Sequence, residues 1–247
     1  LDELFYTDYN QPVNVDRRQF LKKLGGGVMV AFFIGKLSLV EAFGNNPSED
    51  LLNFNAYLKV KENGRIACFT GKIEMGQGVS TSLAQVVADE LNVPITTIDM
   101  VMGDTDLCPY DAGTWGSLTT RFTDPVLRAA AAELREILKS LAAKNLNSSV
   151  EELETINGEI FIKNNPSKKV SFTYLAQNNN LVETLKFKPR IKNSTEFKLI
   201  GKPVRNLDAE AKVTGKALYS GDIKIPNMVY ATIVRPDVYN SKKVSVD

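Results

Sequence analysis

The stretch AYLKVKENGRIACFT, residues 56–70, decides the first part of the fold because it contains two strand-like runs around a tight turn. Apolar and polar residues alternate in each run, and the dipeptide Asn63-Gly64 stands between them. Asn and Gly adopt the backbone angles of short turns more readily than other residues, so this pattern is a strong local signal for a β-hairpin. We therefore expect two antiparallel strands joined at Asn63-Gly64.

A second hairpin and two helices are predicted farther along the chain. The segment LETINGEIFIK, residues 153–163, repeats the Asn-Gly turn between two short runs. Apolar residues recur at helical spacing from Ser80 to Leu91. The same spacing runs from Asp124 to Lys144, where the Asp-Pro start is typical of an N-cap followed by the first helical residue. The apolar run from Thr96 to Asp104 predicts a buried strand.

The resulting order is hairpin, helix, strand, long loop, helix and hairpin. This order predicts the α+β class, a mixed sheet with packed helices. A chain of 247 residues, of which 43% are hydrophobic, is long enough to bury a core in one or two domains. The formal net charge of +1 gives no electrostatic basis for binding nucleic acid.

Histidine is absent from the sequence, and the only cysteines are Cys68 and Cys108. The absence of histidine excludes the usual catalytic triads, zinc proteases and histidine-ligated haem. Two thiols are too few for an iron–sulfur cluster, so electrons leaving this chain would pass to another one. Cys68 lies in a strand-like run and is expected to be a small buried residue, with a disulfide to Cys108 as the alternative.

The N-terminal segment has the form of a twin-arginine export signal, which predicts action in the periplasm. DRRQFLK, residues 16–22, precedes the apolar stretch GGGVMVAFFIG, residues 25–35. As a helix, this stretch would be about 16 Å long, which is short for crossing a hydrocarbon core that is roughly 30 Å thick. Cleavage after Ala42 is expected, and a tilted membrane anchor is the alternative.

Composition divides the chain into three parts, residues 1–42, 43–190 and 191–247. The first part is the signal or anchor, and the second part carries the elements described above. In the third part, strands are expected at Ala217–Tyr219 and Met228–Val234. The chain then stops without a closing element, so this third part is expected to be incomplete as a folding unit.

The stretch GKIEMGQGVST, residues 71–81, places Gly76 and Gly78 just before the first predicted helix. Glycine lets backbone amides approach a ligand closely, and a helix start offers unpaired N–H groups that suit an anion such as phosphate. Gln77 adds an amide that both donates and accepts hydrogen bonds. The alternative is a turn in which the glycines only relieve backbone strain and Gln77 faces solvent.

The loop GDTDLCPYDAGTWGSLTTRFT, residues 103–123, is unusually long for a compact chain, and such loops are often functional. It carries hydroxyl groups at Thr114, Ser117, Thr119 and Thr120. Hydroxyls and backbone amides can hold an anion without a charged partner. The alternative is an Ω-loop in which these hydroxyls satisfy the loop's own backbone.

Three motifs, taken in this order, resemble the molybdopterin-binding region of the xanthine dehydrogenase and aldehyde oxidase superfamily. They are GKIEMGQGVSTSLAQVVADELNV, AGTWGSLTTR and LRAAAAELREILKSLAA, which begin at residues 71, 112 and 127. Together with the twin-arginine segment, RNLDAEAKVTGKALYSGDIKIPNMVYATIVRP, residues 205–236, is similar to the isoquinoline 1-oxidoreductase type of large subunit. In that branch the cofactor-binding segment precedes an α/β hammerhead domain, so residues 191–247 are expected to begin one.

The resemblance implies a molybdenum atom held by the dithiolene of molybdopterin cytosine dinucleotide, with no protein side chain required as a metal ligand. By position, seven residues would contact the pterin and its phosphate: Met75, Gly76, Gln77, Gly78, Thr114, Ser117 and Thr119. Glu74 is expected to be structural, because a buried carboxylate beside an anionic cofactor would be repelled.

The same resemblance implies a molybdenum-dependent hydroxylase that oxidises an aldehyde or an N-heterocycle with water as the oxygen source. The family's general base is a glutamate whose position lies beyond Asp247, so no residue of this chain is predicted to be catalytic. Expected partners are the remaining large-subunit sequence, a small 2Fe–2S subunit, a cytochrome c acceptor and a small-molecule substrate. The alternative is an exported, non-catalytic module without cofactor, derived from a split or truncated relative.

Three positions depart from the family's pattern. Trp115 stands where relatives commonly carry a small residue, and it is expected to be a core residue, a lid or a substrate contact. The usual Pro-Gly-Met reads Pro-Asn-Met here, with Asn227 in the middle. Arg205 is one place out of register in the usual Arg-x-Asp motif.

Overall fold

The computed structural model describes residues 27–32, 56–108, 111, 113–184, 189–235 and 239–242. The chain divides into two compact units between Leu207 and Asp208. The first unit contains the sheets and the long helices, and the second is a short segment with little regular structure. The predicted α+β class is confirmed.

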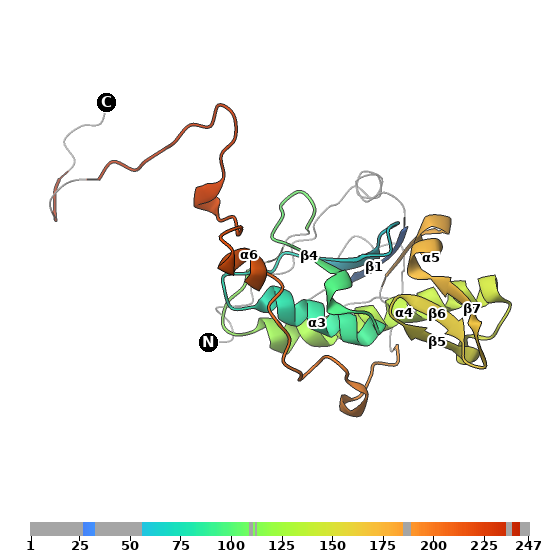
Figure 1. The fold of residues 1–247 in the computed structure, drawn as a ribbon. Helices are drawn as coiled ribbons and strands as arrows, with labels where there is room; N and C mark the ends of the chain where they lie inside the picture. The colour runs from blue at the N-terminus through green and yellow to red at the C-terminus, as the bar shows by residue number, and fades with distance from the viewer. Residues whose placement is uncertain are drawn as a thin grey trace. The chain divides into compact units, whose positions relative to one another are not determined.

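A five-stranded mixed sheet in the order β4-β3-β2-β1-β8 forms the centre of the first unit (Figure 1). Strands β1, β2 and β3 are antiparallel neighbours, whereas β4 is parallel to β3 and β8 is parallel to β1. Their bounds are β1 Gly27–Phe32, β2 Ala56–Val60, β3 Ile66–Thr70, β4 Ile98–Met102 and β8 Asn180–Thr184.

The predicted hairpin at Asn63-Gly64 is confirmed as the pair β2 and β3, although its connection is longer than two residues. Lys61 and Arg65 close it through a backbone hydrogen bond of 2.8 Å, and Gly64 takes a φ of 79°. A side chain at Gly64 would collide with Thr173, because an added Cβ would lie 2.2 Å from its hydroxyl oxygen. Glycine is therefore required there by both backbone angle and space.

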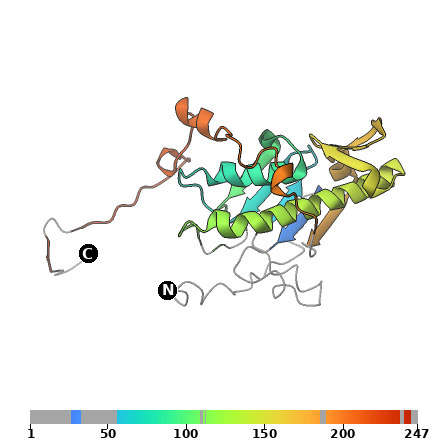
Figure 2. The same cartoon turned by 90° about the horizontal axis from the view of Figure 1, so that it is seen from below.

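Helices α3, Val79–Leu91, and α4, Asp124–Leu146, lie side by side on one face of this sheet (Figures 1 and 2). Both were expected from the spacing of apolar residues. The start of α4 differs by one residue from the prediction, because Thr123 is the N-cap and Asp124 is already helical. Short 3-10 turns lie at Ile95–Thr97, Val150–Glu152 and Ser194–Glu196.

A three-stranded antiparallel sheet lies at the C-terminal end of α4 (Figure 2). It consists of β5 Leu153–Ile156, β6 Glu159–Ile162 and β7 Asn165–Ser171, and it leads into α5, Phe172–Asn178. Asn157 and Gly158 both have positive φ, 53° and 79°, as the predicted two-residue turn requires. Ser171 caps α5 by accepting a hydrogen bond of 3.1 Å from the Tyr174 backbone.

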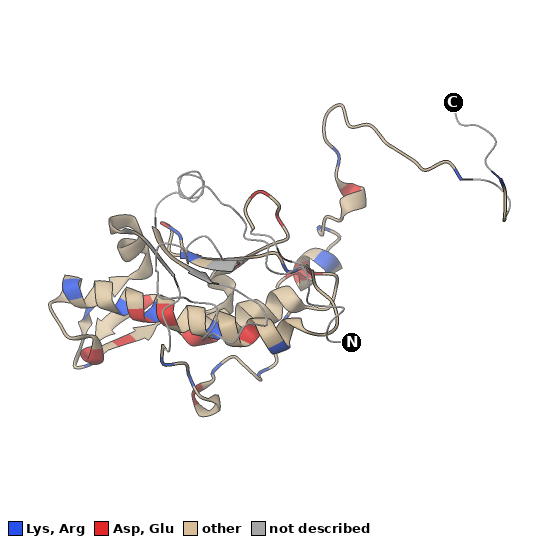
Figure 3. Cartoon of the chain, turned by 180° about the vertical axis from the view of Figure 1, so that it is seen from behind, with Lys and Arg blue, Asp and Glu red and all other residues tan. Residues whose placement is uncertain are grey.

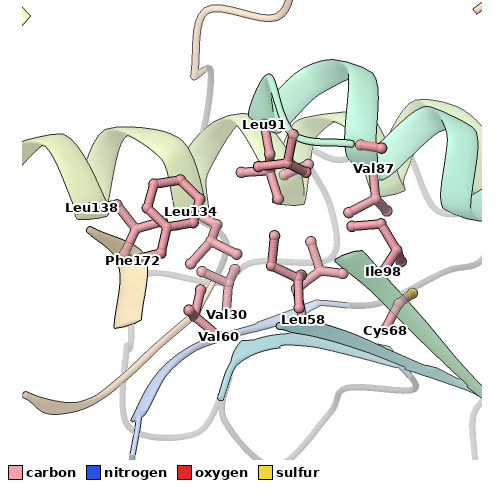
Figure 4. Packing of buried hydrophobic residues seen from close by; sticks show 14 of the residues in the cluster. Val30, Leu58, Val60, Cys68, Val87, Leu91, Ile98, Leu134, Leu138 and Phe172 are labelled. Atoms are coloured by element: carbon pink, nitrogen blue, oxygen red, sulfur yellow. The ribbon is translucent and has the colours of Figure 1, made fainter. Parts of the chain in front are cut away.

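The main core lies between the sheet and the two long helices (Figure 4). Val30, Leu58 and Cys68 project from the strands toward Leu91 of α3 and Leu134 of α4, and all five are buried. Side chains that alternate with these along the strands, such as Met29 and Ala67, belong to the opposite face of the sheet and are also buried. The sheet is therefore covered on both faces at these positions.

Strand β1 coincides with part of the apolar stretch that the sequence indicates as an export signal. In the structure Gly27–Phe32 pairs with β2 on one side and with β8 on the other, and Val28, Met29 and Val30 are buried. The paired arginines and the cleavage position after Ala42 lie outside the described residues. No helix among the described residues is long and apolar enough to cross a membrane.

The predicted strand at Thr96–Asp104 is present as the shorter β4, which is only partly buried. Ile98 is 4% exposed, and the other four residues are intermediate. Only one of its edges is hydrogen-bonded within the described sheet, because β4 ends the strand order. Its Asp99 carboxylate faces the hairpin and binds Lys61 at 2.7 Å and the Arg65 guanidinium.

The segment that follows β8 is bound to α3 by buried charges. Asp89 accepts hydrogen bonds from the backbone N–H groups of Lys198, Leu199 and Ile200, at 2.8–3.2 Å. These bonds, together with Lys192, lower the pKa of Asp89 although its burial would raise it. The segment 191–207 is thus packed against α3, while its expected assignment to a separate domain stays a prediction.

Glu90 lies beside Asp89 and is fully buried. Its carboxylate accepts a hydrogen bond of 2.7 Å from Arg135 of α4, which also donates to the backbone oxygens of Glu90 and Arg190. Acidic and basic residues are interspersed along the helices (Figure 3), but this pair is shielded from solvent. It joins α3, α4 and the segment after β8 at one point.

The second unit contains the short helix α6, Ala209–Val213, and a 3-10 turn at Ser220–Asp222. The strands expected at Ala217–Tyr219 and Met228–Val234 are wrong, because the described residues of this unit contain no strand. A strand requires a hydrogen-bonded neighbour, and these residues have none in the described part of the chain. Apolar side chains there are exposed, as Val229 is at 88%.

Replacing Arg135 with methionine tests the buried pair. The variant removes the cation that lies 2.7 Å from the buried Glu90 carboxylate and leaves only Arg128, at 3.8 Å, so the free energy of unfolding should fall by about 3 kcal/mol in urea denaturation. Lys169→Met is the matched control, because Lys169 pairs with Glu159 at 2.9 Å on the surface and should cost at most about 1 kcal/mol. Equal losses in the two variants would contradict the role given to Arg135.

Candidate functional site

The long loop after β4 is fastened to the segment that precedes the glycine turn. The Lys72 ammonium donates hydrogen bonds to the Asp111 carboxylate at 2.9 Å and to the backbone oxygen of Gly113 at 2.8 Å. The backbone N–H of Ile73 donates to the Thr114 hydroxyl at 2.8 Å. The Asp111 side chain is only 3% exposed, so its ion pair with Lys72 is shielded from solvent.

These contacts bring both predicted binding segments to one cavity of about 300 Å³. The first segment lines it with Met75, Gln77, Val79 and Ser82. The second segment lines it with Thr114, Trp115, Ser117, Thr119 and Thr120. Of the seven residues predicted to bind the cofactor, the cavity lining includes five, and it does not include Gly76 or Gly78.

The glycine turn is closed by a carboxylate from its own chain. Glu74 accepts hydrogen bonds from the backbone N–H groups of Gly76, Gly78 and Ser80 and from the Ser80 hydroxyl, at 2.8–3.0 Å. Gly78 is the N-cap of α3 and has no side chain to cap the helix, so Glu74 does this instead. A negative charge is also favourable at the positive end of the helix.

This geometry confirms the structural role expected for Glu74 and also explains its ionisation. Partial burial would raise the pKa of its carboxyl, but the four hydrogen bonds outweigh burial and lower the pKa. Gly76 and Gly78 adopt positive φ angles of 98° and 78°, which allow the turn to wrap around the carboxylate.

Gln77 also forms hydrogen bonds inside the turn. Its side-chain oxygen accepts from the Met75 backbone N–H, and its side-chain nitrogen donates to the Ile73 oxygen at 2.9 Å. The amides of Met75, Gly76 and Gly78 are therefore engaged by side chains of the turn itself. The expected contact between these amides and a phosphate stays a prediction. It requires the amides to break their hydrogen bonds with Glu74 and Gln77 and to donate to the phosphate instead.

The hydroxyl-bearing side of the cavity has more free donors. Ser117, with a φ of 55°, precedes a π-helical turn, Thr119–Thr123, that continues directly into α4. The hydroxyls of Ser117, Thr119 and Thr120 form no hydrogen bond with the described part of the chain. The first N–H groups of such a helical run also lack intrahelical partners.

Two buried polar atoms at the start of α4 have no hydrogen-bond partner among the described residues. They are the Thr123 hydroxyl oxygen and one carboxylate oxygen of Asp124. Burial raises the pKa of Asp124 to about 6, while the nearby Arg128 opposes the shift. The sequence identified Asp124 as a helix start, but nothing in it indicated that the carboxyl would be shielded from solvent.

The two cysteines are free in the structure, so the disulfide alternative does not apply to it. Burial raises the pKa of the Cys68 thiol to about 12, as expected for a small core residue. Among the described residues, no group of three Cys, Asp or Glu side chains is placed to hold a metal ion. The polar side-chain groups of the cavity lining are hydroxyls, the Gln77 amide and the indole N–H of Trp115.

A family model described as the molybdopterin cofactor-binding domain matches residues 3–217. The chain belongs to this family. The membership of the xanthine dehydrogenase and aldehyde oxidase superfamily expected from the motifs is thereby confirmed, and the xanthine dehydrogenase molybdenum-binding subunit of Escherichia coli O157:H7 is 33% identical over 114 residues. That alignment covers 46% of this chain and 15% of the relative.

Longer alignments relate this molybdopterin-binding chain to components of two other enzymes. One subunit of nicotinate dehydrogenase from Pseudomonas putida KT2440 is 30% identical over 227 residues, which are 92% of this chain and 19% of that protein. The beta subunit of isoquinoline 1-oxidoreductase from Brevundimonas diminuta is 25% identical, over 90% of this chain and 34% of that protein. The chain therefore spans only a minor part of the curated relatives it matches.

Among solved structures, quinoline 2-oxidoreductase from Pseudomonas putida 86 is similar over 65% of this chain and 21% of its own. The identity is 22% and the TM-score is 0.42, so this similarity adds nothing to the family assignment.

Replacing Glu74 with glutamine should loosen the start of α3. The free energy of unfolding at pH 7 should fall by about 1–2 kcal/mol, as for the loss of a charged helix cap. Because the pKa is lowered in the folded state, Glu74 stabilises the fold fully above the ordinary value of 4.5 and less as pH falls through the lowered value. The difference between wild type and variant should therefore shrink in acid.

Urea denaturation at pH 7 and at pH 3 measures this difference. Glu154→Gln is the control, because Glu154 is an exposed carboxylate on β5. A Glu74→Gln variant as stable as the control at pH 7 would contradict the capping role.

Lys72→Met should release the loop from the glycine-turn segment. The Asp111 carboxylate would lose its cation, and the Gly113 oxygen its donor, so the backbone amides at 113 and 114 should exchange hydrogen at least about tenfold faster. Hydrogen exchange read by mass spectrometry measures this. In the control, Lys163→Met, an exposed ammonium that binds the Glu151 oxygen is removed, and the loop should exchange at the wild-type rate.

Proposed function

We propose that this chain forms part of the cofactor-binding subunit of a molybdenum hydroxylase. The observation that carries the proposal is the convergence of the Gln77 segment and the Ser117 segment on one cavity, in a chain of the molybdopterin-binding family. The relatives whose names indicate a reaction are dehydrogenases or oxidoreductases. We extend the activity from them to this chain.

The residues of the cavity fit a phosphorylated pterin. Ser117, Thr119 and Thr120 supply hydroxyl donors that are not used within the described chain, next to the start of a long helical run. Hydroxyls and N–H groups at a helix start bind phosphate well, because they donate hydrogen bonds and the helix dipole favours an anion. Gln77 lies on the same cavity and offers an amide to the polar edge of a pterin.

Each part of the chain has a separate task in this proposal. The molybdenum centre, when bound, supplies the two-electron oxidation of a substrate carbon. The hydroxyl residues hold the phosphate, Gln77 orients the ring system, and Glu74 keeps the turn in shape. No residue of this chain is proposed as a general base.

Several finer points are proposed on the same basis. The cofactor form is molybdopterin cytosine dinucleotide, and the substrate is an aldehyde or an N-heterocycle. Electrons pass to iron–sulfur clusters on a small 2Fe–2S subunit and then to an acceptor such as a cytochrome c. The resemblance of the motifs to the isoquinoline 1-oxidoreductase type supports these points.

A cofactor-free binding or assembly module is the second candidate, and one observation favours it. Glu74 and Gln77 occupy the amides that the glycine turn would otherwise offer to a ligand. A turn that satisfies its own hydrogen bonds has less need of an anion. The two candidates differ in metal content.

Export to the periplasm, with membrane association as a variant, is also proposed, on the strength of the paired arginines at 17 and 18. Cleavage after Ala42 would remove β1, together with the buried side chains of Val28 and Val30, and leave β2 and β8 without the strand between them. N-terminal sequencing of protein from periplasmic and membrane fractions decides the matter. A start at Phe43 would show that the exported domain does without β1.

Molybdenum analysis tests the main proposal. Protein purified as the assembled complex from a host that makes the cofactor should contain about one molybdenum per complex. The triple variant Ser117→Ala, Thr119→Val, Thr120→Val removes three hydrogen bonds to a charged group, and it should retain less than about a tenth of the metal.

Thr105→Val is the matched control, because Thr105 is an exposed hydroxyl of the same loop that does not line the cavity. It should bind molybdenum like the wild type. A complete wild-type complex without molybdenum would contradict the hydroxylase proposal and favour the cofactor-free module.

A further inference from the structure

We propose that the indole of Trp115, supported by Gly113, is a platform on which a planar nitrogen heteroaromatic ring stacks. The ring belongs either to the bound cofactor or to the substrate, which are both planar heterocycles under the proposed function. The proposal rests on that function only for the identity of the ring. The platform itself rests on the geometry of the loop.

Gly113 leaves room for the indole directly against the backbone. A Cβ added at this position would lie 1.8 Å from Cζ3 and 2.3 Å from Cε3 of Trp115. No real side chain tolerates such distances, so any residue other than glycine would push the ring away. The φ of Gly113, 138°, is also in the region that favours glycine.

The backbone that supports the ring is held on both sides. The Gly113 N–H donates to Asp111 at 2.9 Å, and the Gly113 oxygen accepts from the Lys72 ammonium at 2.8 Å. Asp111 and Lys72 also form a shielded ion pair. The indole therefore lies against backbone that these hydrogen bonds already hold, which lowers the ordering cost for a ligand that stacks on it.

The indole remains accessible from the cavity. Trp115 is 42% exposed and lines the cavity together with Met75, which is 67% exposed. Its indole N–H forms no hydrogen bond with the described residues. A tryptophan that served only as core packing would be buried, with its N–H paired.

The chemistry of these groups selects the ligand class. An indole face binds planar π-systems in offset stacking, and the Met75 thioether makes favourable contacts with aromatic ring edges. The free N–H can donate to a ring nitrogen or an exocyclic oxygen. One such stack contributes about a tenfold change in Kd or more, as base-on-aromatic contacts do.

Tryptophan fluorescence tests the platform, because Trp115 is the only tryptophan of the sequence. The probes for the cofactor ring are pterin and cytidine monophosphate, and the probe for a substrate ring is nicotinate. Ribose 5-phosphate and cyclohexanecarboxylate are the non-planar controls. Saturable quenching by a planar probe and none by the controls is expected, and the probe that quenches identifies the source of the ring.

Variants connect the quenching to the geometry. Trp115→Ala should weaken calorimetric binding of the quenching probe about tenfold, and Trp115→Phe, which keeps a smaller ring, should weaken it less. Gly113→Ala should also weaken binding, since it displaces the indole. Gly158→Ala is its control, because Gly158 has a φ of 79° with nothing within 4 Å of an added Cβ.

Equal binding by planar and non-planar probes, absence of saturable quenching, or unchanged affinity in Trp115→Ala would overturn the platform. Molybdenum content of the assembled wild-type complex, measured in parallel, separates this failure from failure of the proposed function. Quenching in a complex without molybdenum supports the platform and contradicts the hydroxylase. Molybdenum in the assembled complex, together with no quenching when the probes are added to cofactor-free protein, supports the hydroxylase and contradicts the platform.

Discussion

The ammonium of Lys72 is the contact on which the site depends. It lies between β3 and the glycine turn, and it binds both a carboxylate and a backbone oxygen of a loop that follows the next strand. Since β3 and β4 are parallel neighbours, their C-terminal ends lie at the same edge of the sheet, and the segments that leave them emerge together. The shielded ion pair with Asp111 then fixes the distance between the segments. Together with the hydrogen bond of 2.8 Å from the Ile73 N–H to the Thr114 hydroxyl, it holds the hydroxyl residues and Gln77 at one cavity.

Glu74 gives the glycine turn a character different from that of a free anion-binding loop. Its carboxylate occupies the place at the start of α3 that an external anion would otherwise favour. The two sides of the cavity are consequently unequal, because the turn is satisfied internally, whereas the hydroxyl side retains unused donors. A phosphate is therefore expected near Ser117 and Thr119, and the turn contributes side chains and shape.

Local chemistry made much of this fold predictable. The turn at Asn157-Gly158 and the Asp-Pro start at Asp124 need only neighbouring residues, and both helices follow from apolar spacing. Strand β1 could not be foreseen, because a short apolar run suits a signal and a buried strand equally well. The strands expected after residue 215 failed because a strand depends on a distant partner. In the site, the hydroxyl residues could be predicted because they cluster in one loop of the sequence. The capping by Glu74 could not be predicted, since it depends on a carboxylate that reaches four residues along the chain to the backbone of a glycine.

The position of β1 has a consequence for how the domain reaches its folded state. Val28 pairs with Leu181, so the central sheet joins residues from opposite ends of the first unit. Contacts between such distant residues form slowly, because the long segment between them must first be closed into a loop, which costs conformational entropy. During synthesis, the hairpin β2–β3 and helix α3 can form early and β1 can pair with β2, but the parallel pair of β1 and β8 has to wait for the ribosome to release β8. Until then, one edge of β1 has no hydrogen-bonded neighbour in the sheet.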